Sequence, residues 1–238
     1  MLEAYGISDP GKVRADNQDA FRIIPELGLY LLADGMGGAR GGERASQLTV
    51  ECVATNLRES STRDAAALLH AVEEANDRVL NEASQNPNLE GMGTTLVAAL
   101  ETSDHDVAIA SVGDSRAYLL DNGALRAITE DQTWIQDVGK QLGLDAATLR
   151  SHPMRHVLTM AVGVSRNIRI RYYAVTLKPR DLLLLSSDGL HGIVDDSRIE
   201  AILNTPKATL ADMCRHLVTA ANYAGAPDNV TVLLLRPV

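Results

Sequence analysis

The feature that most constrains the fold of this chain is a set of short apolar runs, each beside an aspartate. Asp34 follows Leu-Tyr-Leu-Leu-Ala, Asp114 follows Ala-Ile-Ala-Ser-Val-Gly, and Asp188 follows four leucines and two serines. Asp228 opens the last apolar run. Runs of this length predict buried strands, and a carboxylate at the end of a buried strand is costly unless it is paired or bound to a metal. Strands that converge on one hard-cation site would explain the pattern, because such cations prefer oxygen ligands.

The length and the composition indicate one domain in a reducing compartment. The chain of 238 residues contains no linker, repeat or low-complexity segment, so we expect a single catalytic domain over residues 1–238. A formal charge of -9 argues against nucleic-acid binding, which requires a basic face. Two cysteines without a CxxC pair, no visible signal peptide and no apolar run near the ~20 residues of a membrane helix predict a cytoplasmic protein without membrane contact.

Blocks of strands and helices predict an α+β fold. Strands are expected at 2–8, 20–24, 28–33, 94–101, 106–112, 116–120, 125–128, 168–177, 181–187 and 229–235. Helices are expected over 43–57, 63–83, 196–204 and 208–223, where apolar residues recur at helical spacing. The strands form antiparallel-looking blocks with paired helices between them. This order favours a β-sandwich of two mostly antiparallel sheets flanked by pairs of helices, in α-β-β-α layers.

Local signals add detail to this outline. The glycine-rich segment 35–42 predicts a turn before the first helix, and Thr62 is the predicted N-cap of the second. Asp121-Asn122-Gly123 predicts a hairpin turn. Residues 131–165 are polar and irregular, with helical pieces.

Two other phosphate-binding motifs are not supported. The segment after Asp34 lacks the Gly-Lys-Ser/Thr ending of a P-loop, and Arg40 occupies the last glycine position of GxGxxG. Its glycines would instead let backbone carbonyls approach a cation. Cys52 and Arg58 have the spacing of a cysteine-dependent phosphatase, but Cys52 falls on the apolar face of a predicted helix. We interpret it as a core cysteine.

Basic side chains supply candidates for phosphate binding and proton transfer. Arg14 fits an ordinary surface arginine, whereas beside a metal site its planar guanidinium would fit a phosphate with two hydrogen bonds. The six histidines divide by context into structural candidates (His70, His105, His216) and possible proton donors (His152, His156, His191).

Together, seven strings resemble the metal-dependent protein phosphatase family (protein phosphatase 2C, PPM) in its short bacterial form. They run in the family's order over almost the whole chain: Arg14–Asp19, Asp34–Gly38, Gly91–Thr95, Gly113–Tyr118, Leu158–Gly163, Ser187–Leu190 and Asp228–Val232. The resemblance implies a β-sandwich flanked by helix pairs and the hydrolysis of phosphoserine and phosphothreonine in proteins.

The resemblance also implies a set of metal ligands. Asp34 would bridge two core ions, Mn²⁺ or Mg²⁺, and the Gly35 carbonyl would bind one of them. Asp188 and Asp228 would complete the shell of the first ion. Asp19 would act through waters.

Further roles are implied for a third ion and for the substrate. Asp114 would hold a third, weaker ion with help from Asp188. Arg14 would bind the substrate phosphate. Residues 131–165 would contain a variable flap that meets the substrate, and we refer to them as the flap.

The chain departs from the family pattern at several positions: Gln18 for Glu, Met36 for His, Ala39 for His, Gln132 for His and Met160 for Arg. The identity of the general acid is therefore open, and His152 and His156 are the candidates within the flap.

No activated Ser or Cys nucleophile is visible, so metal ions must supply most of the rate acceleration. Two ions ~3.5–4 Å apart would lower the pKa of a shared water and clamp the phosphoryl oxygens, so that the bridging hydroxide attacks phosphorus directly. We expect a monomeric serine/threonine protein phosphatase that opposes a cytoplasmic protein kinase. A phosphoprotein-binding pseudophosphatase and a metal phosphohydrolase for small molecules are the alternatives.

Overall fold

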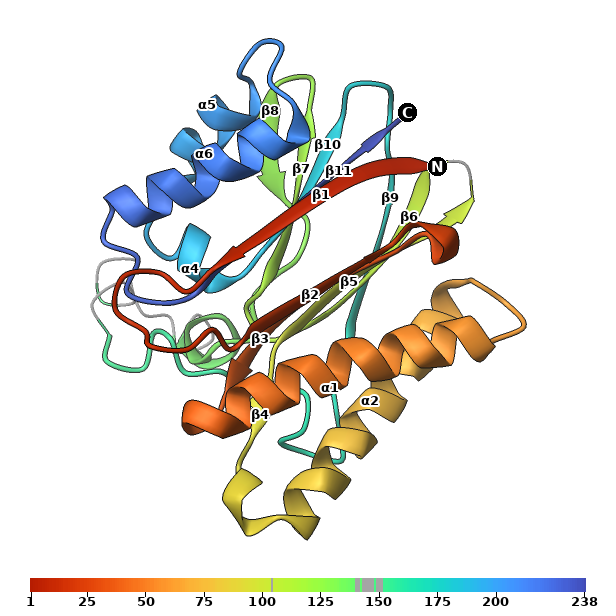
Figure 1. The fold of residues 1–238 in the computed structure, drawn as a ribbon, viewed down its shortest axis with the longest axis vertical. Coiled ribbons are helices and arrows are strands. Elements are labelled where there is room, and N and C mark those ends of the chain that lie inside the picture. Colours follow the sequence, from red (N-terminus) through yellow and green to blue (C-terminus); the bar gives the residue numbers. More distant parts are fainter. Residues whose placement is uncertain (104, 140–141, 143–147, 149–151) are drawn as a thin grey trace.

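The structure is a β-sandwich of two antiparallel sheets with helices on both outer faces (Figure 1). This computed structural model describes residues 1–103, 105–139, 142, 148 and 152–238, except for the side chains of residues 38–40. The predicted α+β sandwich is confirmed. No helix in these ranges is long and apolar enough to cross a membrane.

The first sheet has five strands in the order β1-β11-β10-β7-β8. Their bounds are Leu2–Asp9 (β1), Val230–Pro237 (β11), Leu182–Ser186 (β10), Arg116–Asp121 (β7) and Ala124–Ala127 (β8). The second sheet has the order β2-β3-β5-β6-β9, and the short strand β4 pairs with the end of β3. These strands are Asp19–Ile24 (β2), Leu29–Met36 (β3), Gly93–Thr94 (β4), Leu96–Ser103 (β5), Asp106–Val112 (β6) and Arg171–Thr176 (β9).

Helices cover each sheet on its outer side (Figure 1). The helices α1 (Gly38–Glu59) and α2 (Ala65–Gln85) pack on the second sheet. The helices α4 (Asp188–His191), α5 (Asp196–Leu203) and α6 (Leu210–Tyr223) pack on the first. Short helical turns complete the described elements: η1 (Pro25–Leu27), η2 (Pro87–Leu89) and the π-helical η3 (Ile135–Gly139).

Alternation along the strands divides the apolar residues between separate core layers. In β3, Tyr30 and Leu32 face the space between the sheets, whereas Leu29 and Leu31 face α1 and α2. Both faces of this strand are therefore buried, which explains why its sequence is continuously apolar rather than alternating.

The glycine-rich segment is the main correction to the predicted elements. The predicted turn over 35–42 is wrong for most of its length, because Gly35 belongs to β3 and α1 begins at Gly38. The glycines provide close packing: a Cβ at Gly42 would lie 2.3 Å from Gln18 Oε1. This packing sets the start of α1 against the polar segment that precedes β2.

Two smaller predictions have opposite outcomes. Thr62 is not the N-cap of α2; Asp64 caps it by accepting a hydrogen bond from the Ala67 amide at 2.9 Å. The hairpin turn is confirmed, since Asn122 and Gly123 have φ values of 51° and 83° between the paired strands β7 and β8.

Candidate active site

A cavity of about 710 Å³ lies where the ends of β3, β6 and β10 meet the start of β11. Four of the predicted aspartates line it: Asp34, Asp114, Asp188 and Asp228. Arg14 and Gly35, from the same prediction, lie in the wall as well. The fold thus brings these residues, which are far apart in the sequence, to one cavity, as expected for strands that converge on one site.

Two glycines allow the main chain to come close enough for this arrangement. A Cβ at Gly189 would lie 1.8 Å from the Asn229 carbonyl oxygen, so α4 rests directly on the chain beside Asp228. A Cβ at Gly35 would lie 2.1 Å from the Gly42 carbonyl oxygen, which brings the start of α1 against the end of β3. Any larger residue at either position would push apart elements that carry the aspartates.

The main chain of Asp34 is held by two threonines. Its amide donates to Thr95 Oγ1 at 3.0 Å, and its carbonyl oxygen accepts from the Thr95 amide and from Thr94 Oγ1, both at 2.8 Å. Thr95 Oγ1 is also 2.6 Å from Ser115 Oγ, next to Asp114. The role of these hydroxyls was not predicted from the sequence, although a pair of threonines stands at the entry to a buried strand.

Asp19 lies beside Asp34, because the two residues are register partners in β2 and β3. The charges of Asp19 and Asp188 both act on Asp34 and raise its pKa. Neighbouring carboxylates stay ionised together only when a cation offsets their repulsion. Asp19 Oδ1 is buried and has no hydrogen-bond partner in the described structure.

The electrostatic state of the cluster follows from burial and mutual repulsion. Burial, with the charges of Asp19 and Asp188, holds the pKa of Asp34 well above its ordinary value. Burial and the charge of Asp188 raise the pKa of Asp114 to about 8. Burial also raises the pKa of Asp19 to about 6, although hydrogen bonds from Thr231 and Ser187 oppose the shift. Such a cluster is fully ionised at neutral pH only when a cation offsets its charge.

These residues fit hard divalent cations. The side chains offer carboxylate oxygens, and one buried oxygen, Asp19 Oδ1, has no partner. Within the described ranges, no three Asp, Glu, His or Cys side chains are close enough to hold an ion by themselves. An ion here would therefore also need the Gly35 carbonyl and water, which suits Mg²⁺ and Mn²⁺.

Arg14 is exposed at the rim and is paired with Asp228. Its Nη2 donates to Asp228 Oδ2 at 2.7 Å. The segment that carries it is fixed by Asn229, whose Nδ2 donates to the carbonyl oxygens of Pro10 and Asp16 at 3.0 Å. This role of Asn229 was not predicted from the sequence, although the residue stands directly after Asp228.

The three candidate proton donors lie in different surroundings. His156 lines the cavity, as do Asp34 and Asp188. His152 is stacked on Trp134, with ring centroids 4.2 Å apart. His191 is 3.0 Å from Ser186 Oγ, and burial holds its pKa well below the ordinary value, so it is neutral.

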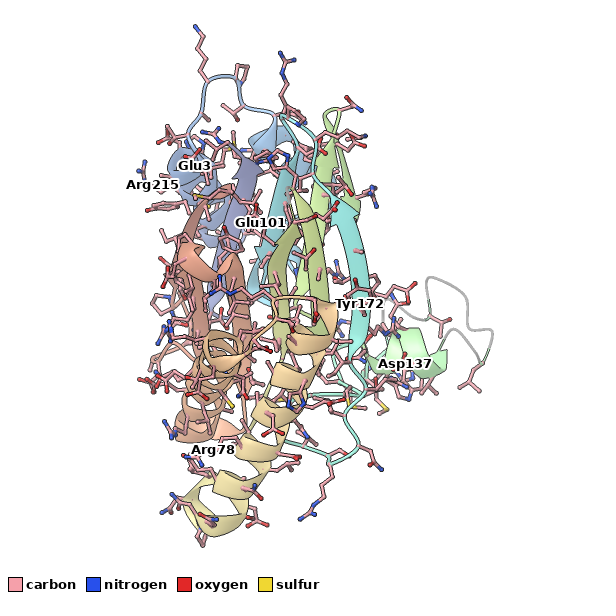
Figure 2. All side chains as sticks on the ribbon, turned by 90° about the vertical axis from the view of Figure 1, so that its right-hand side faces the viewer. Glu3, Arg78, Glu101, Asp137, Tyr172 and Arg215 are labelled. Carbon is pink, nitrogen blue, oxygen red and sulfur yellow. The ribbon has the colours of Figure 1, made fainter. Side chains whose placement is uncertain are left out.

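The flap is joined to the second sheet through Asp137 of η3, beside β9 (Figure 2). Asp137 accepts hydrogen bonds from Thr159 Oγ1 at 2.5 Å, Arg169 Nη2 at 2.6 Å and Arg171 Nη2 at 3.1 Å. We call these four residues the flap base. Flap residues 140–141, 143–147 and 149–151 lie outside the described residues.

Gln132, where the resemblance implies a histidine, connects the flap to the Asp114 loop. Its Oε1 accepts from the Gly113 amide at 2.8 Å, and its Nε2 donates to the Arg169 carbonyl oxygen at 2.7 Å. The substitution therefore supplies a buried donor and acceptor that hold the main chain next to Asp114.

Comparisons with known proteins agree with this geometry. The family model described as Protein phosphatase 2C matches residues 12–223. The chain is 35% identical over 237 residues to the serine/threonine phosphatase stp of Listeria monocytogenes, covering 96% of this chain and 93% of that protein. The crystal structure of the Mycobacterium tuberculosis serine/threonine phosphatase PstP/Ppp superposes with a TM-score of 0.89 at 34% identity, covering 99% and 98% of the two chains. A PstP catalytic domain in complex with two manganese ions has a TM-score of 0.86 at 33% identity, covering 99% and 97%.

Proposed function

This chain belongs to the protein phosphatase 2C family and is a metal-dependent serine/threonine protein phosphatase, and we propose that the aspartate-lined cavity is its active site. Its substrates are phosphorylated proteins, and its reaction is the hydrolysis of a phosphoric monoester. The observation that carries the assignment of the site is the meeting of Asp34, Asp188 and Asp228 in one cavity with Arg14 at its rim.

We propose that the carboxylates divide the metal binding among them. The charges of Asp19, Asp188, Asp114 and Asp228 all act on Asp34, which supports a central position, and Asp34 would hold both core ions with help from the Gly35 carbonyl. Asp188 and Asp228 would hold the first ion, and Asp19 would act through water. When bound, Mn²⁺ or Mg²⁺ ions would supply the Lewis acidity that activates a water and offsets the charge of the phosphoryl group.

A third, weaker ion is proposed at Asp114, with Asp188 as the shared ligand. The charge of Asp188 is the largest influence on the pKa of Asp114 after burial, which supports their proximity. Fewer carboxylates surround this position than surround Asp34, so its affinity should be lower.

Arg14 is proposed to bind the substrate phosphate. Its guanidinium already binds one anionic group, the Asp228 carboxylate, at 2.7 Å. More than half of the Arg14 side chain is exposed, so it can turn to a phosphate in the cavity. A guanidinium offers two parallel N–H donors to phosphoryl oxygens, which orients the group for in-line attack.

His156 is proposed as the general acid, because of the two flap histidines it is the one that lines the cavity. A proton held on its ring would pass to the serine or threonine oxygen as that oxygen leaves. His152, stacked on Trp134, is the weaker of the two candidates.

The biological setting is proposed on the same basis. We propose that residues 1–238 form one catalytic domain of a monomeric cytoplasmic enzyme, without nucleic-acid or membrane partners, that opposes a serine/threonine kinase. The formal charge of -9 supports the absence of nucleic-acid binding.

Phosphate release tests the proposed function directly. We expect Mn²⁺-dependent release from a phosphothreonine peptide and from an aryl phosphate, abolished by EDTA, with nucleotides as poorer substrates. Binding of phosphopeptide without release would favour a regulatory scaffold. Faster release from nucleotides than from phosphopeptides would favour a small-molecule phosphohydrolase.

A further inference from the structure

The two carboxylate oxygens of Asp19 have opposite surroundings. Oδ2 accepts hydrogen bonds from Thr231 Oγ1 at 2.6 Å and from Ser187 Oγ at 2.9 Å. Oδ1 is buried but has no hydrogen-bond partner in the described part of the chain. A buried carboxylate oxygen without a donor is costly, and this one belongs to the register partner of Asp34.

The donors to Oδ2 are held in place by a directed chain of hydrogen bonds. Each hydroxyl has only one proton, and Thr231 gives its proton to Asp19. Ser8 Oγ, 2.7 Å from Thr231 Oγ1, must therefore donate to it and must accept from Asn17 Nδ2, also at 2.7 Å. The direction of every bond is thus determined from Asn17 to Asp19.

The second donor is oriented by the main chain. Ser187 Oγ accepts from the Thr231 amide at 3.0 Å and so points its own proton at Asp19 Oδ2. Thr231 and Ser187 are both completely buried. Water therefore does not compete for either hydroxyl, and neither can rotate away without losing a bond.

We propose that Thr231 is a positioning residue, which together with Ser187 saturates Asp19 Oδ2 so that Oδ1 alone is presented to the metal site. The inference rests on the metal role proposed for Asp19 and concerns residues that surround this ligand. Hydroxyl donors fix the carboxylate without adding a positive charge that would compete with the ion. Outer partners of this kind typically contribute ~10–100-fold in metal affinity.

The decisive variant is Thr231→Val, which keeps the shape of the side chain and removes the hydroxyl. Binding of Mn²⁺ to the full chain, titrated by calorimetry, should weaken by about 10–100-fold. Thr231→Ser should restore affinity, because it restores the donor. KM for an aryl phosphate should change little while kcat falls, since Thr231 has no place at the substrate.

The protein itself supplies a matched control. Thr49 is also completely buried, but its hydroxyl has no hydrogen-bond partner in the described structure. Thr49→Val therefore makes the same chemical change without removing a bond, and it should leave Mn²⁺ affinity unchanged. Ser187→Ala can be compared in the same way with Ser111→Ala, because Ser111 Oγ is buried and unpartnered as well.

The outcomes separate this inference from the proposed function. Wild-type Mn²⁺ affinity in folded Thr231→Val, or equal losses in Thr231→Val and Thr49→Val, would overturn the positioning role. If Thr231→Val fails to fold, the Mn²⁺ affinities of Ser187→Ala and Ser111→Ala are compared instead, and equal losses in these two variants would overturn the positioning role. A wild-type protein that binds no Mn²⁺ would instead overturn the proposed metal site itself.

Discussion

Around Asp19 and Asp34 the polar contacts are made by buried neutral groups, whereas around Asp137 they are made by ion pairs near the surface. Thr95 and Thr231 are almost fully buried, and their bonds run to main chain and carboxylate. In the flap base, Asp137 and Arg171 are 18% and 22% exposed, whereas Arg169 is 55% exposed and Arg171 also pairs with Glu130, which is 75% exposed. Buried hydrogen bonds are insensitive to salt, while exposed ion pairs are screened and contribute little.

The two regions have different structural requirements. The ligands of a metal site must keep one geometry, so they are fixed by groups that cannot exchange with water. A segment that meets varied protein substrates must adapt, and weak exposed contacts allow it to do so. Substitutions around Asp19 and Asp34 should therefore abolish the reaction or weaken metal binding, and substitutions in the flap base should only modulate the reaction.

The largest effect is expected from Asp34→Ala. Mn²⁺-dependent turnover should fall below detection, because both core ions lose their shared ligand. The metal-free protein should keep or raise its melting temperature, since removal of a buried carboxylate relieves repulsion from Asp19 and Asp188. Substantial activity of this variant at saturating Mn²⁺ would exclude the two-ion mechanism.

The next largest effect is expected from His156→Ala. If His156 is the general acid, kcat should fall by ~10²-fold or more for a phosphothreonine peptide and far less for an aryl phosphate, whose leaving group needs no proton. His152→Ala is the matched control, since that ring is stacked on Trp134. Equal losses for the two substrates would remove His156 from the acid role.

Arg14→Ala should act mainly on substrate binding. Loss of a charge-assisted contact of about 1.5–3 kcal/mol corresponds to a KM raised by roughly 10–100-fold. Arg14→Lys should recover only part of this, because lysine lacks the planar fork. An unchanged KM for a phosphopeptide in Arg14→Ala would reduce Arg14 to a surface charge that pairs with Asp228.

The proposed ligands were easier to find in the sequence than the groups that hold them. Asp34, Asp188 and Asp228 stand at the ends of apolar runs, which predicted that they meet, and they line one cavity. Thr231 and Asn229 act through contacts with segments more than 200 residues away, which no local pattern encodes.

The fold shows the same division between local and long-range signals. Strand and helix order followed from periodicity, and the sandwich was predicted from it. The segment 35–42 was misassigned, because glycine normally disfavours helix and only close packing against Gln18 and Met92 explains its use there. His191 had the surroundings of a catalytic histidine in sequence, whereas burial makes it neutral.

A smaller effect is expected in the pH dependence of the metal-free protein. The pKa of Asp114 is raised from 3.8 to about 8, so the folded state binds this proton more tightly than the unfolded state. Stability should therefore fall as pH rises from about 4 to 8. Asp114→Asn should show a shallower fall in melting temperature over this range. The same Asp114→Asn variant should still bind two Mn²⁺ ions, as measured by calorimetry. It should lose most of its activity on phosphopeptides if a third ion takes part.

The smallest effect is expected at the flap base, where Asp137→Asn keeps the shape and removes the charge that Arg169 and Arg171 share. Because part-exposed pairs of this kind contribute about 0.5 kcal/mol each, the loss of both should raise KM for a phosphopeptide by about fivefold. KM for an aryl phosphate should be unchanged, since Asp137, Thr159, Arg169 and Arg171 do not line the cavity. Added salt should produce the same rise in the wild-type protein and little further change in Asp137→Asn. A loss as large as that of Arg14→Ala, or one equal for both substrates, would mean that the flap base shapes the cavity itself, and the contrast between the two regions would fail.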